Sequence, residues 1–161
     1  MATVHLICGQ LGAGKTVRAR EVAGREGGVR FSLDEWIMGM FGSEAPEPMT
    51  LEWWSDRAGR CERRIWQLCE DLLMHSLDVV LDFGFPTRAM RDRYRQLARA
   101  VSAPVKIHVV TADRELRRER VQRRNQQRGE TFALVVTGAM FDGSEGWWEP
   151  LAADELEAGE S

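Results

Sequence analysis

The sequence predicts an α/β fold in which helices cover both faces of a mainly parallel sheet. Two observations lead to this prediction. Short apolar segments alternate along the chain with longer segments of helical periodicity. The chain has 161 residues, of which 43% are hydrophobic, so residues 1–161 are expected to form one domain around one core. Right-handed crossovers between parallel strands then place the connecting helices on both faces of the sheet.

Four short apolar segments are the expected strands. Each is bounded on at least one side by glycine, proline or a polar residue, and they are Val4–Cys8, Val29–Ser32, Val79–Phe83 and Val105–Val110. Ligands of open α/β sheets bind beyond the carboxyl ends of the strands. The residues that follow these four segments are therefore the first candidates for a functional site.

The segments between and after the strands have the pattern of helices. In the longest of them an apolar stripe, Cys61, Ile65, Leu68 and Leu72, recurs at steps of three and four residues. The proline-containing stretch Gly42–Thr50 is the clearest loop, and an acidic tail ends the chain. The expected helices are Thr16–Arg25, Leu51–Leu77, a segment capped by Thr87 that runs to Val101, Asp113–Arg128 and a short one over Gly138–Ser144.

Composition excludes several classes of protein. The formal net charge of −3 offers no general attraction to nucleic acid or to an anionic membrane. No apolar run approaches the roughly 20 residues that span a bilayer, and the N-terminus lacks the features of a signal peptide, so a cytoplasmic protein is expected. The three cysteines lack the CxxC spacing of a zinc site, and they are expected to be reduced and mostly buried.

The segment GQLGAGKT, Gly9–Thr16, fits the phosphate-loop pattern GxxxxGK[ST] between a predicted strand and a predicted helix. Glycines let successive N–H groups point inward as an anion nest, and the following helix adds its positive end. Lys15 is one of two lysines among 22 basic residues, and its compact ammonium suits the β and γ phosphates. The Thr16 hydroxyl is a ligand for Mg²⁺. The expected nucleotide-binding residues are Gly9, Gly12, Ala13, Gly14, Lys15 and Thr16.

Two aspartates follow or end other strands. Asp34, after the second strand, has the position of a base that accepts the proton of an attacking hydroxyl, or of a plain helix cap. Asp82 lies near the end of the third strand, where it is expected to hold Mg²⁺ directly or through water. The alternative for Asp82 is a turn-forming residue shortly before Gly84.

The last long helix, 113–128, is rich in arginine. Arg117, Arg120 and Arg124 share one of its faces, and cations that close over a γ-phosphate favour phosphoryl transfer. We expect this helix to be a lid whose arginines contact the nucleotide. The alternatives are a solvated helix face, since two glutamates interleave with the arginines, or a patch for RNA backbone.

In this order the motifs resemble the small P-loop kinases related to zeta toxins, chloramphenicol phosphotransferase and polynucleotide kinase. The resemblance runs from about Val4 to Asn125, and the ending WWEPLAADE is similar to the FEPP..DE close of such proteins. It implies a P-loop NTPase three-layer sandwich with an arginine-rich helical lid, using ATP and Mg²⁺. The segments that carry it are ICGQLGAGKT, SLDEW, VVLDFGF..R and RRERVQRRN.

The resemblance also implies roles for single residues. Asp34 matches the general base of these kinases, and Arg120 and Arg124 match the lid arginines that act with Lys15 in catalysis. Arg88 matches an arginine that commonly follows the third-strand motif and binds phosphate or substrate. Thr16 and Asp82 then remain the expected magnesium residues.

The favoured function is ATP-dependent transfer of a γ-phosphate to a hydroxyl of a small molecule, such as an antibiotic, a nucleoside or a sugar. One alternative is a kinase of 5′-hydroxyl RNA ends, which the acidic composition disfavours. The other is an ATP-binding or ATPase switch module without a phosphate acceptor. No membrane partner is expected.

Tryptophans are the remaining candidates for ligand contact. Trp36, Trp53 and Trp54 could stack on a flat acceptor, or they could pack in the core. Trp147 and Trp148 could flank adenine, or they could pack against the sheet.

Overall fold

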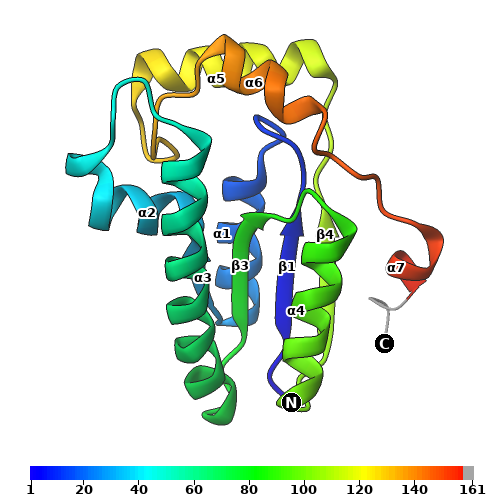
Figure 1. Cartoon of the computed structure of the whole chain (residues 1–161). Helices are drawn as coiled ribbons and strands as arrows, with labels where there is room; N and C mark the ends of the chain where they lie inside the picture. The colour runs from blue at the N-terminus through cyan, green and yellow to red at the C-terminus, as the bar shows by residue number, and fades with distance from the viewer. Residues whose placement is uncertain (158–161) are drawn as a thin grey trace.

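The computed structural model of the protein describes residues 1–157 and contains a sheet in which every neighbouring pair of strands is parallel (Figure 1). The strand order is β2-β3-β1-β4. Each strand coincides with a predicted segment to within one residue. The strands are β1 (Val4–Cys8), β2 (Val29–Ser32), β3 (Val79–Gly84) and β4 (Val105–Val109).

Within the described residues the strands are connected and followed by seven α-helices and a short 3-10 helix. The predicted loop before α3 contains the 3-10 helix η1, and the predicted acidic tail contains α7. The helices are α1 (Lys15–Glu26), α2 (Leu33–Phe41), η1 (Gly42–Glu44), α3 (Leu51–Met74), α4 (Arg88–Ala100), α5 (Arg114–Gln127), α6 (Gly138–Glu145) and α7 (Ala153–Glu157).

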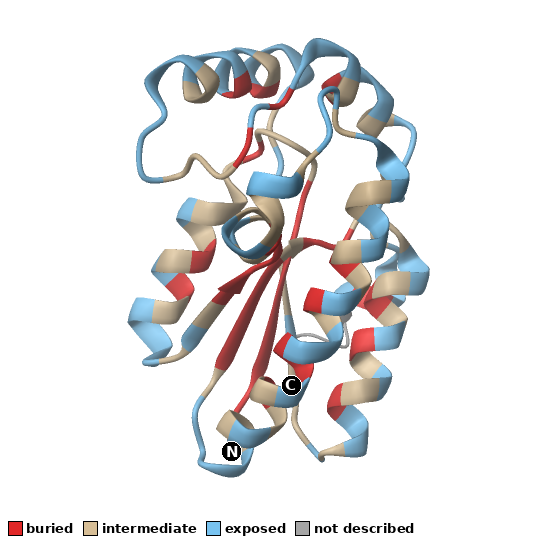
Figure 2. Ribbon diagram, turned by 60° about the vertical axis from the view of Figure 1, so that its left-hand side comes forward, coloured by how far each residue is buried: buried red, intermediate tan, exposed pale blue. Residues whose placement is uncertain are grey.

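The sheet and the helices on its two faces form three layers. Ala19 of α1 packs against Ile7 of β1 on one face. On the other face, Ile65 of α3 and Tyr94 of α4 belong to the cluster that contains Leu6 of β1. Figure 2 shows buried residues along the strands and on the helix faces turned towards them. The chain therefore has the predicted three-layer sandwich, in which the two central strands, β1 and β3, are buried on both sides.

Helices α5 and α6 lie across the carboxyl edge of the sheet, above the end of β1 (Figure 1). They have a small apolar cluster of their own, separate from the two clusters that pack on the sheet. Its buried members are Val121 of α5, Leu134 and Val136 of the connecting segment, and Phe141 of α6. The arginine-rich helix is therefore part of a covering unit that includes α6, and it faces the strand ends.

The structure rules out two of the alternative roles that the sequence left open, one for Asp34 and one for Asp82. The cap of α2 is Ser32, whose hydroxyl accepts a hydrogen bond from the Glu35 amide at 3.3 Å, so Asp34 is not the helix cap. Asp82 lies inside β3, in register with Ser32 of β2, so it is not a turn residue. Both aspartates therefore lie at the carboxyl ends of neighbouring strands. The prediction for Thr87 is confirmed, since its hydroxyl accepts from the Met90 amide at 3.2 Å.

The remaining sequence predictions concern the cysteines and membrane association. Cys8, Cys61 and Cys69 are buried free thiols, as predicted. None of the helices within residues 1–157 combines the length and the apolarity that crossing a membrane requires.

Candidate active site

The loop between β1 and α1 has the backbone shape of an anion-binding nest. Gly12 and Gly14 have left-handed φ angles of 75° and 103°. Helix α1 begins at Lys15, directly after Gly14, and no acidic residue lies in its first turn. The first N–H groups of a helix have no partner within the helix. Here they are directed into the loop without a nearby carboxylate in that turn, which suits a polyphosphate.

Two loop glycines are required by close packing. A Cβ atom at Gly9 would clash with the carbonyl oxygen of Val110, which follows β4. A Cβ atom at Gly12 would clash with the carbonyl oxygen of Arg117 in α5. The loop therefore contacts the covering unit directly, and its position depends on that of α5.

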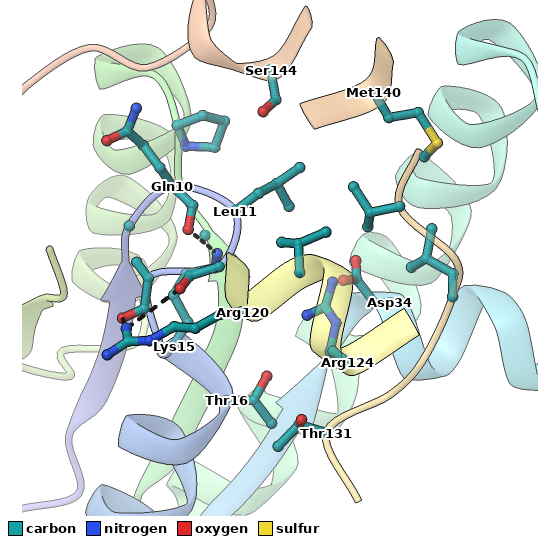
Figure 3. Close-up of a pocket in the computed structure, with 18 of the residues that line it drawn as sticks. Gln10, Leu11, Lys15, Thr16, Asp34, Arg120, Arg124, Thr131, Met140 and Ser144 are labelled. Carbon is teal, nitrogen blue, oxygen red and sulfur yellow. Dashed lines mark hydrogen bonds between the residues drawn. The ribbon is translucent and has the colours of Figure 1, made fainter. Parts of the chain in front are cut away.

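The Lys15 side chain lies under the loop. Its Nζ donates a hydrogen bond to the carbonyl oxygen of Gln10 at 2.8 Å (Figure 3). A Cβ atom at Gly84, the last residue of β3, would lie 3.3 Å from the Lys15 Cε atom. Burial lowers the pKa of the Lys15 ammonium, while the nearby carboxylates of Asp82 and Asp34 oppose this shift. Lys15 is thus held between the two aspartates and the phosphate loop.

Asp34 and Asp82 share the environment of Lys15. Burial raises the pKa of the Asp34 carboxyl above its usual value, although Lys15 opposes the shift. Burial also raises the pKa of Asp82, against the effects of Lys15 and the Thr16 hydroxyl. A half-buried carboxyl with a raised pKa is a stronger base than an exposed one.

Arg30 of β2 organises the acidic edge of the site. Its Nη1 atom is 3.1 Å from Asp82 Oδ2, and its Nη2 atom is 2.7 Å from Glu35 Oε1. The Asp82 side chain is only 4% exposed. This ion pair orients one Asp82 oxygen and leaves the carboxylate beside Thr16, so the two residues predicted to hold Mg²⁺ do lie together. Magnesium in proteins is commonly held by one or two carboxylates, substrate phosphates and water, and this pair of donors fits that pattern.

Two of the predicted lid arginines point into the site. Arg120 donates from Nη1 to the carbonyl oxygen of Ala13 at 3.2 Å. Arg124 lies beside Asp34 in Figure 3, and its buried Nε atom has no hydrogen-bond partner in the part of the chain described. An unpaired buried donor is costly, which is consistent with a site for an anionic group at Arg124.

The other two predicted nucleotide-binding arginines lie outside this group. Arg117 is buried, and its guanidinium pairs with Glu145 of α6 at 2.7 Å and donates to the carbonyl oxygen of Leu11 at 3.3 Å. Arg88 pairs with Asp154 at the C-terminal end of the described chain. Neither lines the cavity described next. Arg117 instead joins α5, α6 and the phosphate loop.

A cavity of about 1000 Å³ opens between the phosphate loop and the covering unit. Its size lies at the upper end of the ~300–1000 Å³ typical of small-molecule sites. It is lined by the phosphate loop, by polar and charged residues described above and by an apolar group from α3, α6 and the segment before α6. The charged lining residues are Lys15, Asp34, Asp82, Arg120, Arg123 and Arg124.

The tryptophans divide between core and cavity. Trp36 and Trp53 pack against the main core, and neither lines the cavity. Trp54 both contacts the core and lines the cavity, and Trp147 and Trp148 line it as well.

Sequence reasoning missed several residues of the site. Arg30 lies on a strand outside every motif, and Gly84 lies within the VVLDFGF segment without an assigned role. Only the pairing of β2 with β3 and the path of Lys15 reveal what the two residues do. Glu145 is distant in sequence from its partner Arg117. The only sequence signal for Arg30 is its position in the second strand, two residues before Ser32.

The fold and this site define a P-loop nucleoside-triphosphate-binding protein with a kinase-like architecture. Residues 4–141 match the AAA domain family (AAA_33), so the chain belongs to this family. This agrees with the resemblance to small P-loop kinases noted in the sequence. No curated protein shows significant similarity to the chain.

Solved structures show the same fold at low sequence identity. A candidate kinase from Chloroflexus aurantiacus J-10-fl has a TM-score of 0.71 and 15% identity, covering 88% of this chain and 73% of its own. Kti12 from Chaetomium thermophilum, in complex with ADP-AlF3, has a TM-score of 0.68 and 16% identity, covering 91% and 80%. A chain of the Pnkp1/Rnl/Hen1 RNA repair complex has a TM-score of 0.65 and 14% identity, covering 99% of this chain but 45% of its own.

Proposed function

We propose that the protein is an ATP-dependent phosphotransferase that moves the γ-phosphate to a hydroxyl group of a small molecule. The observation that carries the proposal is the position of Asp34, which lines the same cavity as the phosphate loop and is influenced by Lys15. A phosphate site beside a buried carboxylate base is the arrangement that hydroxyl phosphorylation requires. The match to the AAA domain family supports the nucleotide part of this proposal.

The phosphate loop and Lys15 would hold the triphosphate. The loop amides and the N-terminus of α1 bind the phosphate oxygens, and Lys15 neutralises the charge that develops between the β and γ phosphates. Thr16 and Asp82 would hold Mg²⁺. When bound, the ion would offset the negative charge of the phosphates.

Asp34 would act on the acceptor. Its carboxylate accepts the proton of the acceptor hydroxyl as that oxygen forms a bond to the γ-phosphorus. The bond between the γ-phosphorus and the bridging oxygen of the β-phosphate breaks, ADP leaves, and the proton passes from Asp34 to water. Arg120 and Arg124 stabilise the negative charge on the transferring group, and the covering unit excludes water that would hydrolyse ATP.

Two other functions remain as outcomes of the same experiment. The likeness in fold to a chain of an RNA repair complex favours a kinase of 5′-hydroxyl RNA ends as the second candidate. That candidate predicts oligonucleotide binding that weakens steeply with salt. An ATPase switch predicts hydrolysis without any phosphorylated acceptor, stimulated by a protein partner.

The test is incubation of the full chain with γ-labelled ATP, Mg²⁺ and a panel of antibiotics, nucleosides, sugars and 5′-hydroxyl oligoribonucleotides. A labelled small-molecule product is the expected result. Asp34→Asn should lower product formation about 10²- to 10⁴-fold while retaining ATP binding. Asp71→Asn, at an exposed position near the far end of α3, should leave product formation unchanged. Full transfer by Asp34→Asn would refute the assignment of the base.

A further inference from the structure

The cavity has two chemically different halves. Around the phosphate loop lie the cations Lys15, Arg120 and Arg124. The other half, bounded by the start of α3, the segment before α6 and α6 itself, is largely apolar. We call this the acceptor half, and its apolar lining residues are Met49, Leu51, Trp54, Leu134, Val136 and Met140.

The acceptor half adjoins Asp34 directly. A small hollow beside the main cavity is lined jointly by Asp34, Arg124, Thr131 and Leu134. Figure 3 shows Asp34 below Met140, with Thr131 on the segment that approaches Asp34 from the covering unit. A molecule whose hydroxyl reaches Asp34 can therefore place its remaining atoms against this apolar lining.

The wall of the acceptor half is held in place without a ligand. Asn125 of α5 forms two hydrogen bonds with the backbone of Val136, donating to its carbonyl oxygen at 2.7 Å and accepting from its amide at 3.1 Å. Leu134 and Val136 are 8% and 4% exposed, and both pack with Val121. The apolar surface is therefore preformed, which lowers the entropy cost of binding a ligand to it.

The cations that line the cavity are committed elsewhere. Arg120 contacts the phosphate loop, and Arg123 pairs with Glu119 at 2.7 Å. Lys15 donates to the loop carbonyl of Gln10, and the proposed transfer places the γ-phosphate at Arg124. An acceptor with its own phosphate or carboxylate would therefore meet the carboxylates of Asp34 and Asp82, and the one lining cation outside the proposed nucleotide contacts, Arg123, is 58% exposed and already paired with Glu119. Placing a charge in an apolar environment without a partner is costly.

We propose that the phosphate acceptor is an uncharged alcohol with a substantial apolar or aromatic part. This inference rests on the proposed function, and it narrows the acceptor class. Neutral glycosides, nucleosides and aromatic alcohols belong to the class, whereas sugar acids, phosphorylated metabolites and RNA ends do not. The hydroxyl lies at Asp34 and the apolar part lies against Leu134, Val136 and Met140.

The test compares matched pairs that differ by one anionic group. The pairs are benzyl alcohol and 4-(hydroxymethyl)benzoate, 4-nitrophenyl β-glucoside and 4-nitrophenyl β-glucuronide, and a nucleoside and its 3′-monophosphate. Binding is measured by calorimetry on the full chain saturated with a non-hydrolysable ATP analogue and Mg²⁺, so that a γ-phosphate is present, and transfer is measured separately with labelled ATP. We expect neutral members to bind at least tenfold more tightly than their charged partners.

Replacing a residue of the acceptor half by lysine provides the control for specificity. Met140→Lys, in the acceptor half, should shift the ratio of charged to neutral binding at least tenfold towards the charged members. Met74→Lys, at a residue that is 72% exposed on the far end of α3, should leave the ratio unchanged. If Met140→Lys does not fold, Ala139→Lys serves instead, because Ala139 is exposed on α6 and also lines the cavity.

The outcomes separate the two proposals. Neutral binding without phosphate transfer would refute the phosphotransferase and retain the acceptor class as a ligand class. Transfer to charged members in preference to neutral ones would refute the acceptor class and retain the phosphotransferase. Equal binding within every pair, or no binding by any neutral member, would also overturn the acceptor class.

Discussion

Arg91 of α4 and Glu155 of α7 form an ion pair in which neither side chain has any exposed surface, with 2.7 Å between Arg91 Nε and Glu155 Oε1. Arg91 also donates to the carbonyl oxygen of Phe85 at 3.0 Å, and Glu155 accepts from the amide of Ala152. The pair therefore joins the end of the described chain to the segment that follows β3. Removing one partner leaves a buried charge without compensation.

Glu155→Gln should lower the free energy of unfolding by about 3 kcal/mol, measured by urea denaturation, because Arg91 loses its counter-charge. Asp154→Asn, which affects the exposed pair with Arg88, should change it far less, because solvent screens that pair. Arg91 holds the pKa of Glu155 below its usual value. The stabilising contribution is therefore present above that usual value and is lost as the pH falls through the lowered pKa. Equal effects of the two substitutions would contradict this account.

Asp34→Asn should raise the stability of the protein while lowering its activity. Burial raises the pKa of Asp34, so ionisation of this carboxyl destabilises the fold as the pH rises from its usual value through the raised one. Replacement by neutral asparagine should therefore increase the melting temperature at pH 7, while phosphate transfer falls about 10²- to 10⁴-fold. The measurements are thermal unfolding without ligands and a labelled-ATP assay. A lowered melting temperature would show that the carboxylate is instead required by the fold.

Gly12→Ala should weaken ATP binding at least tenfold. Its Cβ atom would clash with the Arg117 carbonyl oxygen, and the φ angle of 75° is unfavourable for alanine, so the loop and α5 must move apart. Gly24→Ala is the matched control, because nothing lies within 4 Å of its Cβ position in α1. It should leave ATP binding unchanged and stabilise the protein by about 0.5–1 kcal/mol. Calorimetric titration with ATP and Mg²⁺ checks both, and unchanged binding by Gly12→Ala would refute the packing argument.

His108 should make stability depend on pH. The pKa of His108 is lowered from 6.5 to about 4, mainly by burial and to a smaller extent by the neighbouring His5. The two rings are joined by a nitrogen–nitrogen contact of 3.0 Å, and His5 also contacts Asp78. Because the unfolded chain takes up the proton first, the stabilising contribution present above pH 6.5 is lost as the pH falls towards 4. His108→Gln should flatten the unfolding free energy over this range, and an unchanged slope would contradict the assignment.

The fold was predictable because the chain has a consistent local pattern. The Val4–Cys8 and Val79–Gly84 segments are apolar enough to be buried on both faces, and the phosphate loop has a spacing that occurs in one structural context. Asp34 and Asp82 could be selected as candidates from their positions at strand ends. Their alternatives could be dismissed only by the backbone, because Ser32 competes for the cap and strand register decides where Asp82 lies.

Other features depend on contacts between distant segments, which periodicity does not encode. Arg117 shares a helix face with Arg120 and Arg124, yet Glu145 holds its guanidinium away from the cavity. Arg88 likewise meets Asp154 from a tail that the sequence describes only as acidic. An arginine-rich helix shows that cations are available, and the acidic partners determine which of them remain for a ligand.

The contact of Arg117 with Gly12 and Leu11 anchors one end of α5 to the phosphate loop, whereas the other end leads into the 129–137 segment. Insertions at the two ends of α5 are therefore expected to have different effects. An insertion near the anchored end would displace the phosphate loop, whereas one within 129–137 would change the part of the cavity wall that contains Leu134 and Val136. Under the proposed function, a change in this single connection would therefore alter the choice of acceptor while leaving the phosphate loop in place.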